Sequence, residues 1–180
     1  MRLSALFILV RLVLPIRRCL PTALPPLCER YPVTDLEQLA TRVREHIPLT
    51  RHLDFQLESF ADEQLILRAP LAANVNDKGT MFAGSQAALM ALAGWCMTTL
   101  QAERMRPRMD VLAMQNSLHY QRPVTGDITI VVTATEEDLQ RFRERLGSAQ
   151  RAVLPIQAQG LNADGSLASS YQADYLARLL

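Results

Sequence analysis

The apolar residues of this chain recur with two different periods, one typical of helices and one typical of strands. The first helical pattern begins after Val33-Thr34-Asp35, and Thr34 stands three residues before Glu37, which is the spacing of a capping box. Apolar residues then follow at helical spacing as far as Pro48, which cannot continue a helix. This stretch therefore predicts one amphipathic helix.

A strand-like pattern and then a long apolar segment follow this helix. Residues 53–60 alternate apolar and polar positions, residues 63–70 form a second strand-like run, and Ala61-Asp62 predicts the short turn of a hairpin between them. Residues 83–101 contain almost no charge, and Ala, Leu and Met dominate them, which favours a helix. Because that segment is apolar on nearly every side, we expect it to be buried on every side.

The rest of the chain supplies the sheet that such a helix needs around it. Residues 137–147 have the pattern of a short polar helix that ends at Gly147. The turn residues 162–165 are typical of a hairpin. Four further runs are expected to be strands: 110–121, 127–136, 151–161 and 166–176. This order predicts an α+β fold, in which an antiparallel sheet wraps around one long buried helix.

The first 32 residues differ in composition from the rest. Residues 3–16 are apolar except for Ser4 and Arg11, which is too short and too interrupted for a membrane span of ~20 apolar residues. The prolines that follow argue against continuous structure. Residues 1–32 are compatible with a non-native extension, a membrane-proximal anchor or a disordered tail. We place the folded domain at 33–180 and do not expect a membrane as partner.

Charge and cysteine content narrow the function classes. The chain has 180 residues, a net charge of +1 and no basic stripe, so nucleic acid is not an expected partner. Cys19, Cys28 and Cys96 have no metal-ligand spacing, and we predict no metal and no cofactor. Cys96 lies in an apolar run, where a buried thiol is favoured over a nucleophile. A reducing, cytoplasmic setting fits this cysteine usage.

The most distinctive segment connects the predicted hairpin to the long helix. It is Asn74-Val-Asn-Asp-Lys-Gly-Thr-Met-Phe-Ala-Gly-Ser85, and it contains the only lysine among 19 Lys and Arg residues. Together with the Ala-rich helix through Gly94-Trp95, this segment resembles the YiiD C-terminal, thioesterase-like branch of the hotdog fold. The resemblance covers roughly residues 34–178.

The resemblance implies a hotdog domain that acts on a thioester of acyl-carrier protein or of coenzyme A. Some members of the family are understood to be malonyl-acyl-carrier-protein decarboxylases, which make acetyl-carrier protein as a primer for fatty-acid synthesis. Because hotdog domains pair, the resemblance also implies a homodimer or a dimer of dimers, with sites at the shared interface.

Asn76, Gly84 and Ser85 suit catalysis on a thioester, and Gly79 is expected to contact substrate. Gly79 permits a tight backbone path, and Gly84 begins the long helix, whose first N–H groups can hold a thioester oxygen that gains negative charge. Asn76 is the first choice for a catalytic side chain because its amide donates without titrating. The alternative is an ordinary turn asparagine. Ser85 either binds substrate or caps the helix.

The other residues of the segment are expected to contact substrate or to shape the loop. Asn74 either donates to a carbonyl or braces the loop by binding backbone groups. Phe82 is expected to line the pocket, because a large apolar ring cannot transfer protons. Thr80 is expected in the loop or at a cap. Lys78 is either a compact positive charge for the substrate or a solvated loop lysine.

The absence of a histidine and an acid at two positions helps to distinguish hydrolysis from decarboxylation. Many hotdog thioesterases carry Asn-x-x-Gly-x-x-His-Gly-Gly here, with a catalytic acid nine positions after the His. In this chain Phe82 replaces the His, Ala91 stands at the acid position, and no acid occurs between Asp77 and Glu103. Hydrolysis needs a nucleophile or base, whereas decarboxylation needs a desolvated carboxylate and donors for an enolate.

We therefore expect decarboxylation of a malonyl thioester. Hydrolysis is the alternative, in which Asp77 is the base, and a non-catalytic module that binds acyl thioesters is a second one. His119 is expected to be structural. The arginines at 104, 106 and 108 are either solvated or bind the phosphate of a pantetheine arm or an acidic carrier.

Overall fold

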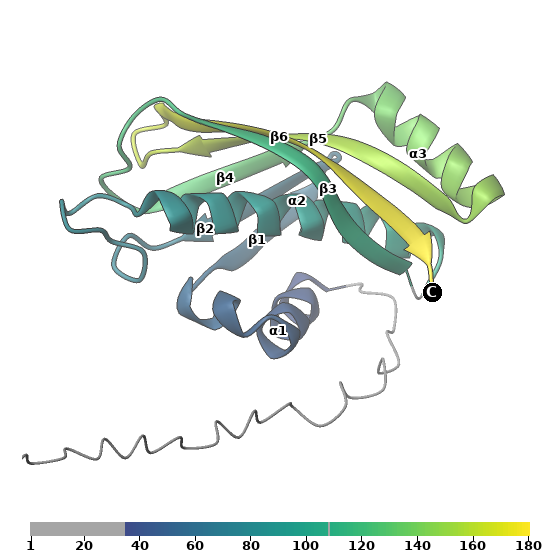
Figure 1. Ribbon diagram of the computed structural model, residues 1–180, viewed down its shortest axis with the longest axis horizontal. Helices are drawn as coiled ribbons and strands as arrows, with labels where there is room; N and C mark the ends of the chain where they lie inside the picture. Colours follow the sequence, from purple (N-terminus) through teal and green to yellow (C-terminus); the bar gives the residue numbers. More distant parts are fainter. Residues whose placement is uncertain (1–34, 108) are drawn as a thin grey trace, which may run out of the picture.

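The computed structural model describes residues 35–107 and 109–180 (Figure 1). The elements in chain order are α1 (Leu36–His46), the 3-10 helix η1 (Pro48–His52), β1 (Gln56–Ala61), β2 (Gln64–Ala69), α2 (Ala83–Met105), β3 (Met109–Tyr120), β4 (Ile128–Thr133), α3 (Glu136–Ala149), β5 (Arg151–Leu161) and β6 (Leu167–Leu179). The expected extension at residues 1–32 lies outside the described residues. Among the described helices, none is long and apolar enough to span a membrane.

The strands form one six-stranded antiparallel sheet in the order β1-β2-β4-β5-β6-β3. The alternating pattern that predicted strands also sets their burial, since β5 alternates between exposed and buried residues along its length. One face of the sheet therefore packs on the core and the other meets solvent. The sheet curves around α2 (Figure 1), which confirms the predicted α+β arrangement.

Helix α2 lies along the concave face of the sheet and supplies much of the core (Figure 1). Leu89 and Met97 are fully buried there. The expectation of burial on every side is wrong, however, because Ala88, Ala91 and Trp95 are only partly buried. These three residues follow one another at helical spacing and form one strip. The sheet of a single chain thus leaves one side of α2 partly uncovered.

Two helix ends differ from the sequence prediction. The N-cap of α1 is Asp35, whose Oδ1 accepts a hydrogen bond from the Glu37 N–H at 3.0 Å, and the predicted cap Thr34 lies outside the described residues. Helix α3 continues through Gly147 and is followed by Gln150 in the left-handed conformation (φ 58°). A hydrogen bond from Leu179 N–H to the Gln150 carbonyl at 2.9 Å holds this end, so a tertiary contact sets it instead of the glycine.

The β1–β2 hairpin is confirmed, but its turn lies one residue later than predicted. Asp62 and Glu63 both have positive φ, 48° and 57°, as a tight two-residue hairpin turn requires. β1 begins at Gln56 instead of Leu53, and the preceding 3-10 helix η1 was not predicted. Leu53 is nevertheless buried in the core.

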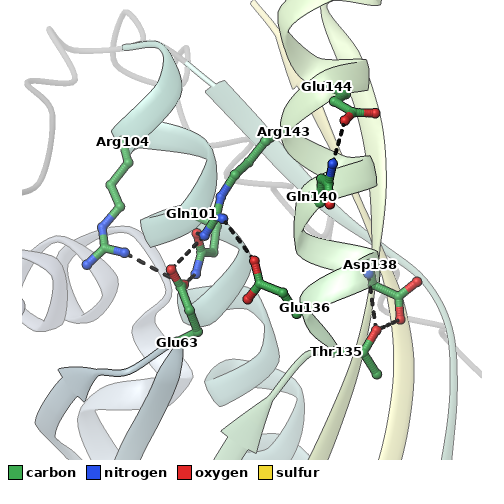
Figure 2. Close-up of polar contacts among 9 residues, drawn as sticks. All are labelled: Glu63, Gln101, Arg104, Thr135, Glu136, Asp138, Gln140, Arg143 and Glu144. Atoms are coloured by element: carbon green, nitrogen blue, oxygen red, sulfur yellow. Dashed lines mark hydrogen bonds and ion pairs between the residues drawn. The ribbon is translucent and has the colours of Figure 1, made fainter.

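The Glu63 side chain ties this hairpin to two helices (Figure 2). Its carboxylate lies 2.6 Å from Nη2 of Arg143 on α3 and 3.7 Å from Nη1 of Arg104 on α2, and it accepts a hydrogen bond from Gln101. Arg143 also lies 3.9 Å from Glu136. We call these five residues the Glu63 cluster. It fastens the hairpin and α3 near the C-terminal end of α2.

Candidate functional site

Three loops meet at the opposite end of the molecule, around the N-terminus of α2 (Figure 1). They connect β2 to α2, β3 to β4 and β5 to β6. Met81 N–H donates to the Val124 carbonyl at 2.8 Å, and Thr125 N–H donates to Oδ1 of Asn162 at 3.3 Å. The hairpin turn predicted at 162–165 is confirmed by Gly165, whose φ is 80°. The distinctive sequence segment thus lies among cross-linked loops.

Within that segment the backbone of Asn74–Phe82 forms a narrow hairpin that leads directly into α2. Phe82 N–H donates to the Asn74 carbonyl, and Asn76 N–H donates to the Thr80 carbonyl, both at 2.7 Å. Val75 and Met81 pair as an antiparallel bridge between these bonds. Gly79 has a φ of 76°, so the predicted need for a glycine in a tight path is confirmed. Backbone hydrogen bonds therefore hold this hairpin along its length.

Asn74 is buried and braces the loop, which is one of its two predicted roles. Its Nδ2 donates to the carbonyls of Leu53 at 2.9 Å and of Pro70 at 2.8 Å, so both amide hydrogens are used. Its Oδ1 is buried without a hydrogen-bond partner in the described part of the chain. An asparagine with both hydrogens engaged cannot donate to a substrate.

Asn76 also holds the loop, through bonds typical of a turn asparagine. Its Oδ1 accepts from the N–H groups of Lys78 at 2.8 Å and Thr80 at 3.1 Å, and its Nδ2 donates to Oγ1 of Thr80 at 2.9 Å. One amide hydrogen remains for a substrate. Thr80 is thus a loop residue, as expected, and the Asn76 side chain is fixed before any ligand arrives.

The two charges of the segment point into solvent and pair with each other. Lys78 Nζ lies 3.2 Å from Oδ1 of Asp77, and more than three quarters of each side chain is exposed. A solvated pair of this kind contributes little to stability. The Asp77 carboxylate thus lies in water beside an ammonium group, away from the desolvated surroundings that suit a general base.

The first turn of α2 is open and lacks a side-chain cap. Its N-cap residue is Phe82, and no side chain bonds to the first N–H groups, which have no acceptor within the helix. Asp35 and Thr135 do cap α1 and α3. Ser85 is the third residue of the helix, so its predicted alternative as a cap is wrong. These N–H groups remain available to an oxyanion, with the favourable end of the helix dipole behind them.

Phe82 and Gly84 form the closest contact at this turn. A Cβ atom on Gly84 would clash with Cε1 of the Phe82 ring and would lie 2.8 Å from its Cζ. The ring therefore lies against the backbone of the first turn, while Phe82 as a whole is 56% exposed. The predicted role of Phe82 in lining the site stays a prediction, and no sequence pattern indicated its contact with Gly84.

Sequence reasoning missed two further residues at this turn. Tyr120 at the end of β3 donates its hydroxyl to the Ala83 carbonyl at 2.9 Å and so anchors the helix start to the sheet edge. Gln86 is buried, and its Oε1 has no hydrogen-bond partner among the described residues. Only the tertiary fold brings these residues to the first turn.

The other candidate groups lie elsewhere. Burial, opposed by the charge of Arg42, raises the pKa of the Cys96 thiol to about 12, which confirms a buried thiol that is no nucleophile. His119 is exposed on β3, where its Nε2 lies 3.2 Å from Ser117 Oγ. Neither group reaches the first turn of α2.

Arg104 and Arg106 are far from the segment and have structural partners. At ~1.5 Å per residue, Arg104 lies roughly 30 Å from Gly84 along α2. It belongs to the Glu63 cluster and also lies 4.3 Å from the centroid of the Phe60 ring. Arg106 donates to the Gly147 carbonyl at 2.8 Å, and Arg108 lies outside the described residues. The structure does not bring Arg104 or Arg106 to the candidate site.

Two hollows open on the outer face of the sheet. One of about 450 Å³ is lined by β3, β5, β6 and the start of α3, and one of about 570 Å³ lies beside β2 and β4. No residue from 74 to 85 lines either of them. We place the site at the α2 N-terminus on chemical grounds, and there it is an open surface in the single chain.

Comparison with known proteins identifies the family. The model of a family described as "Putative thioesterase (yiiD_Cterm)" matches residues 36–179. A structure titled "putative thioesterase from Shewanella oneidensis" is 29% identical, with a TM-score of 0.69, and the match covers 81% of this chain and 97% of that one. This match supports the resemblance found in the sequence.

Two more distant structures share the fold. A protein of unknown function from Chlorobaculum tepidum is 24% identical, with a TM-score of 0.74 over 84% of this chain and 99% of that one. A "Probable Thioesterase" from Pseudomonas aeruginosa is 23% identical, with a TM-score of 0.66 over 83% and 98%. The predicted hotdog fold is confirmed.

Proposed function

The chain belongs to the YiiD C-terminal thioesterase family, and on that premise we propose that it is an enzyme acting on an acyl thioester at the first turn of α2. The observation that carries this proposal is the open, uncapped start of α2, with the rigid Asn74–Phe82 hairpin in front of it. Backbone N–H groups that are already oriented stabilise a developing oxyanion by ~3 kcal/mol per donor.

Decarboxylation of a malonyl thioester is the reaction that these surroundings support best. Helix α2 carries no acidic residue before Glu103, which is paired with Arg42 at 3.0 Å near the far end of the helix. Ala91 occupies the position at which many other hotdog thioesterases carry a catalytic acid, and Asp77 is solvated. Hydrolysis would need one of these positions to activate water, whereas decarboxylation needs no base.

The proposed reaction moves one electron pair. The bond between the carboxyl carbon and the methylene carbon of the malonyl group breaks, and carbon dioxide leaves. The electron pair enters the thioester, whose carbonyl oxygen becomes an enolate oxygen held by the first N–H groups of α2. A proton from solvent then adds to the methylene carbon, and the product is the acetyl thioester.

The residues of the segment take distinct parts in this proposal. Asn76 fixes the hairpin and offers its remaining amide hydrogen to the substrate. Gly84 supplies backbone N–H, and Ser85 offers a hydroxyl on the same turn. Lys78 attracts the anionic substrate from solvent. Asn74, Gly79 and Thr80 hold the shape of the loop.

Two features of the proposal come from the family resemblance. The acyl group is carried by acyl-carrier protein or coenzyme A, and the acetyl product serves as a primer for fatty-acid synthesis. The enzyme acts as a homodimer or a dimer of dimers. The partly uncovered strip of α2 and the open first turn support pairing, because a second copy would close both.

Hydrolysis of the thioester is the second candidate function. The Shewanella and Pseudomonas structures support it, since the first is described as a "putative thioesterase" and the second as a "Probable Thioesterase". It would require Asp77 to leave its pair with Lys78 and act as the base.

Turnover in heavy water separates the reactions. Decarboxylation of malonyl-coenzyme A in D₂O would place solvent deuterium in the methyl group of acetyl-coenzyme A. Hydrolysis would release malonate and the free thiol instead. A protein that only binds acyl thioesters would leave malonyl-, acetyl- and long-chain substrates unchanged, and that result would contradict the proposed enzyme.

The Asn76→Ala variant tests the site. We expect kcat to fall by about tenfold to a hundredfold, because the hairpin that orients the thioester loses its brace and one donor. Asp77→Asn is the matched control, because it replaces one carboxylate oxygen of the neighbouring residue with an NH2 group, and decarboxylation should keep its kcat. If Asp77→Asn abolishes turnover and Asn76→Ala does not, the hydrolytic candidate replaces the proposal.

A further inference from the structure

The Phe82 backbone is fixed while its side chain is not. Its N–H donates to the Asn74 carbonyl at 2.7 Å, and its carbonyl accepts from Gln86 N–H at 3.1 Å. The residue is nevertheless 56% exposed, so no packed core holds the ring in one rotamer. A rotation about two side-chain bonds is therefore enough to move the ring away from the helix.

Gly84 is a glycine because of this ring. Its φ is not among the positive values that occur at Gly79 and Gly165, so its backbone conformation does not require glycine. A glycine within a helix is also less favourable than alanine by ~1 kcal/mol. The space that a Cβ would need is taken by Cε1 and Cζ of Phe82. Glycine at position 84 thus lowers the stability of the helix and leaves room for the Phe82 ring on the first turn.

We infer that the Phe82 ring is a movable apolar cover over the first turn of α2, and that it excludes water from the substrate bound there. This inference rests on the proposed function and assigns a further residue to it. An ionised malonyl carboxylate under an apolar ring loses its hydration. This loss destabilises the charged carboxylate and so favours its release as carbon dioxide. Gly84 acts through the ring as a positioning residue.

The inference makes a distinctive prediction for two variants and their combination. Phe82→Ala removes the cover, and Gly84→Ala pushes the ring off the turn while keeping a good helix former at that position. With malonyl-coenzyme A as substrate, each should lower kcat by about tenfold and change KM by less than about threefold. Phe82→Leu, which keeps an apolar side chain, should recover most of kcat.

The double variant decides between a shared and a separate role. If Gly84 acts through the ring, Gly84→Ala should have no further effect on kcat in the Phe82→Ala background. An equal loss in both backgrounds would overturn the inference, and so would an unchanged kcat in Phe82→Ala. Leu49→Ala is the control for loss of an exposed apolar side chain, because Leu49 is 62% exposed on η1.

A second measurement does not depend on turnover. The chain has five phenylalanines, so fluorine NMR of protein labelled with 4-fluorophenylalanine gives few signals, and the one missing from Phe82→Leu belongs to the ring. Addition of acetyl-coenzyme A should shift that signal. If wild-type protein converts no thioester but this signal shifts, the proposed reaction is wrong and the cover stands. If turnover occurs and the signal does not move, the cover is wrong and the reaction stands.

Discussion

At the scale of single residues, two glycines predict opposite effects of one substitution. Gly79 has a φ of 76° and Gly147 lies inside α3, and a Cβ at either position would meet nothing within 4 Å. Gly79→Ala should lower the free energy of unfolding by about 1 kcal/mol, because alanine is strained in the left-handed region. Gly147→Ala should raise it by up to about 1 kcal/mol through helix propensity.

Urea unfolding of both variants beside the wild type measures these two effects. The two substitutions change the same atoms in equally open surroundings, so each serves as the control for the other. A change of the same sign in the free energy of unfolding for both variants would contradict the backbone conformation assigned to the Asn74–Phe82 hairpin.

The buried thiol of Cys96 predicts a pH dependence of stability. Desolvation raises its pKa from 9.0 to about 12 in the folded chain. The stabilising contribution is therefore complete below pH 9 and is lost as the pH rises toward 12, because only the unfolded thiol ionises in that interval. The free energy of unfolding should fall between pH 8 and 10 with a slope that approaches ~1.4 kcal/mol per pH unit.

Cys96→Ala is the variant that isolates this effect. Its free energy of unfolding should be lower at pH 8 but should change less between pH 8 and 10. Burial also raises the pKa of Tyr171 and Tyr175, whose ordinary value is 10.0, so measurements above pH 10 would mix the three groups. Parallel pH profiles of variant and wild type would mean that the thiol reaches water in the folded state.

The chemistry of individual residues was only partly predictable from the sequence. The tight path at Gly79 and the burial of Cys96 followed from local pattern and were confirmed. The sequence could not decide between the two predicted roles of Asn74, because its acceptors include the carbonyl of Leu53, which only the tertiary fold brings near. The contact of Phe82 with Gly84 depends on one rotamer, which no spacing rule specifies.

At the scale of elements, the Glu63 cluster predicts how the hairpin is held against α2 and α3. Glu63→Gln would remove the carboxylate that Arg143 and Arg104 share. The two arginines would then lie without it beside the buried amide of Gln101. We expect a loss of about 1–3 kcal/mol in the free energy of unfolding. Glu137→Gln is the matched control, since Glu137 also pairs with one arginine at 2.6 Å but its side chain is 84% exposed.

The control variant should change the free energy of unfolding by less than about 1 kcal/mol. Thermal or urea unfolding of the two variants gives the comparison. Equal small losses would mean that the cluster is solvated in solution and does not hold the three elements together.

Element types were predictable where hydrophobic periodicity was strong. The long helix and the strands after it were confirmed because their patterns extend over ten residues or more. Element ends were less predictable, since long-range bonds decide them. Gln150 ends α3 with the help of Leu179, a residue close to the C-terminus, and the glycine signal at Gly147 was misleading.

At the scale of the whole molecule, the free edge of β3 predicts pairing of two copies. β3 is the last strand of the sheet, and Met114 on it is 59% exposed. A long edge strand with apolar side chains is a template for a second chain. Met114→Lys should shift the protein from dimer toward monomer in light scattering coupled to size-exclusion chromatography.

Val153→Lys is the control for this variant, because Val153 is also an exposed apolar residue but lies on β5, which has a strand on each side. It should leave the molar mass unchanged. A wild-type protein that elutes as a monomer at micromolar concentration would contradict the proposed pairing.

The reaction on a malonyl thioester is the central claim, and mass spectrometry of the carrier tests it most directly. Purified protein is incubated with malonyl-acyl-carrier protein, beside acetyl- and long-chain acyl-carrier controls, and the mass of each carrier is followed. Conversion of malonyl- to acetyl-carrier protein with release of carbon dioxide, and no change in the controls, is the result we predict. Appearance of the free carrier thiol would contradict decarboxylation and identify a thioesterase.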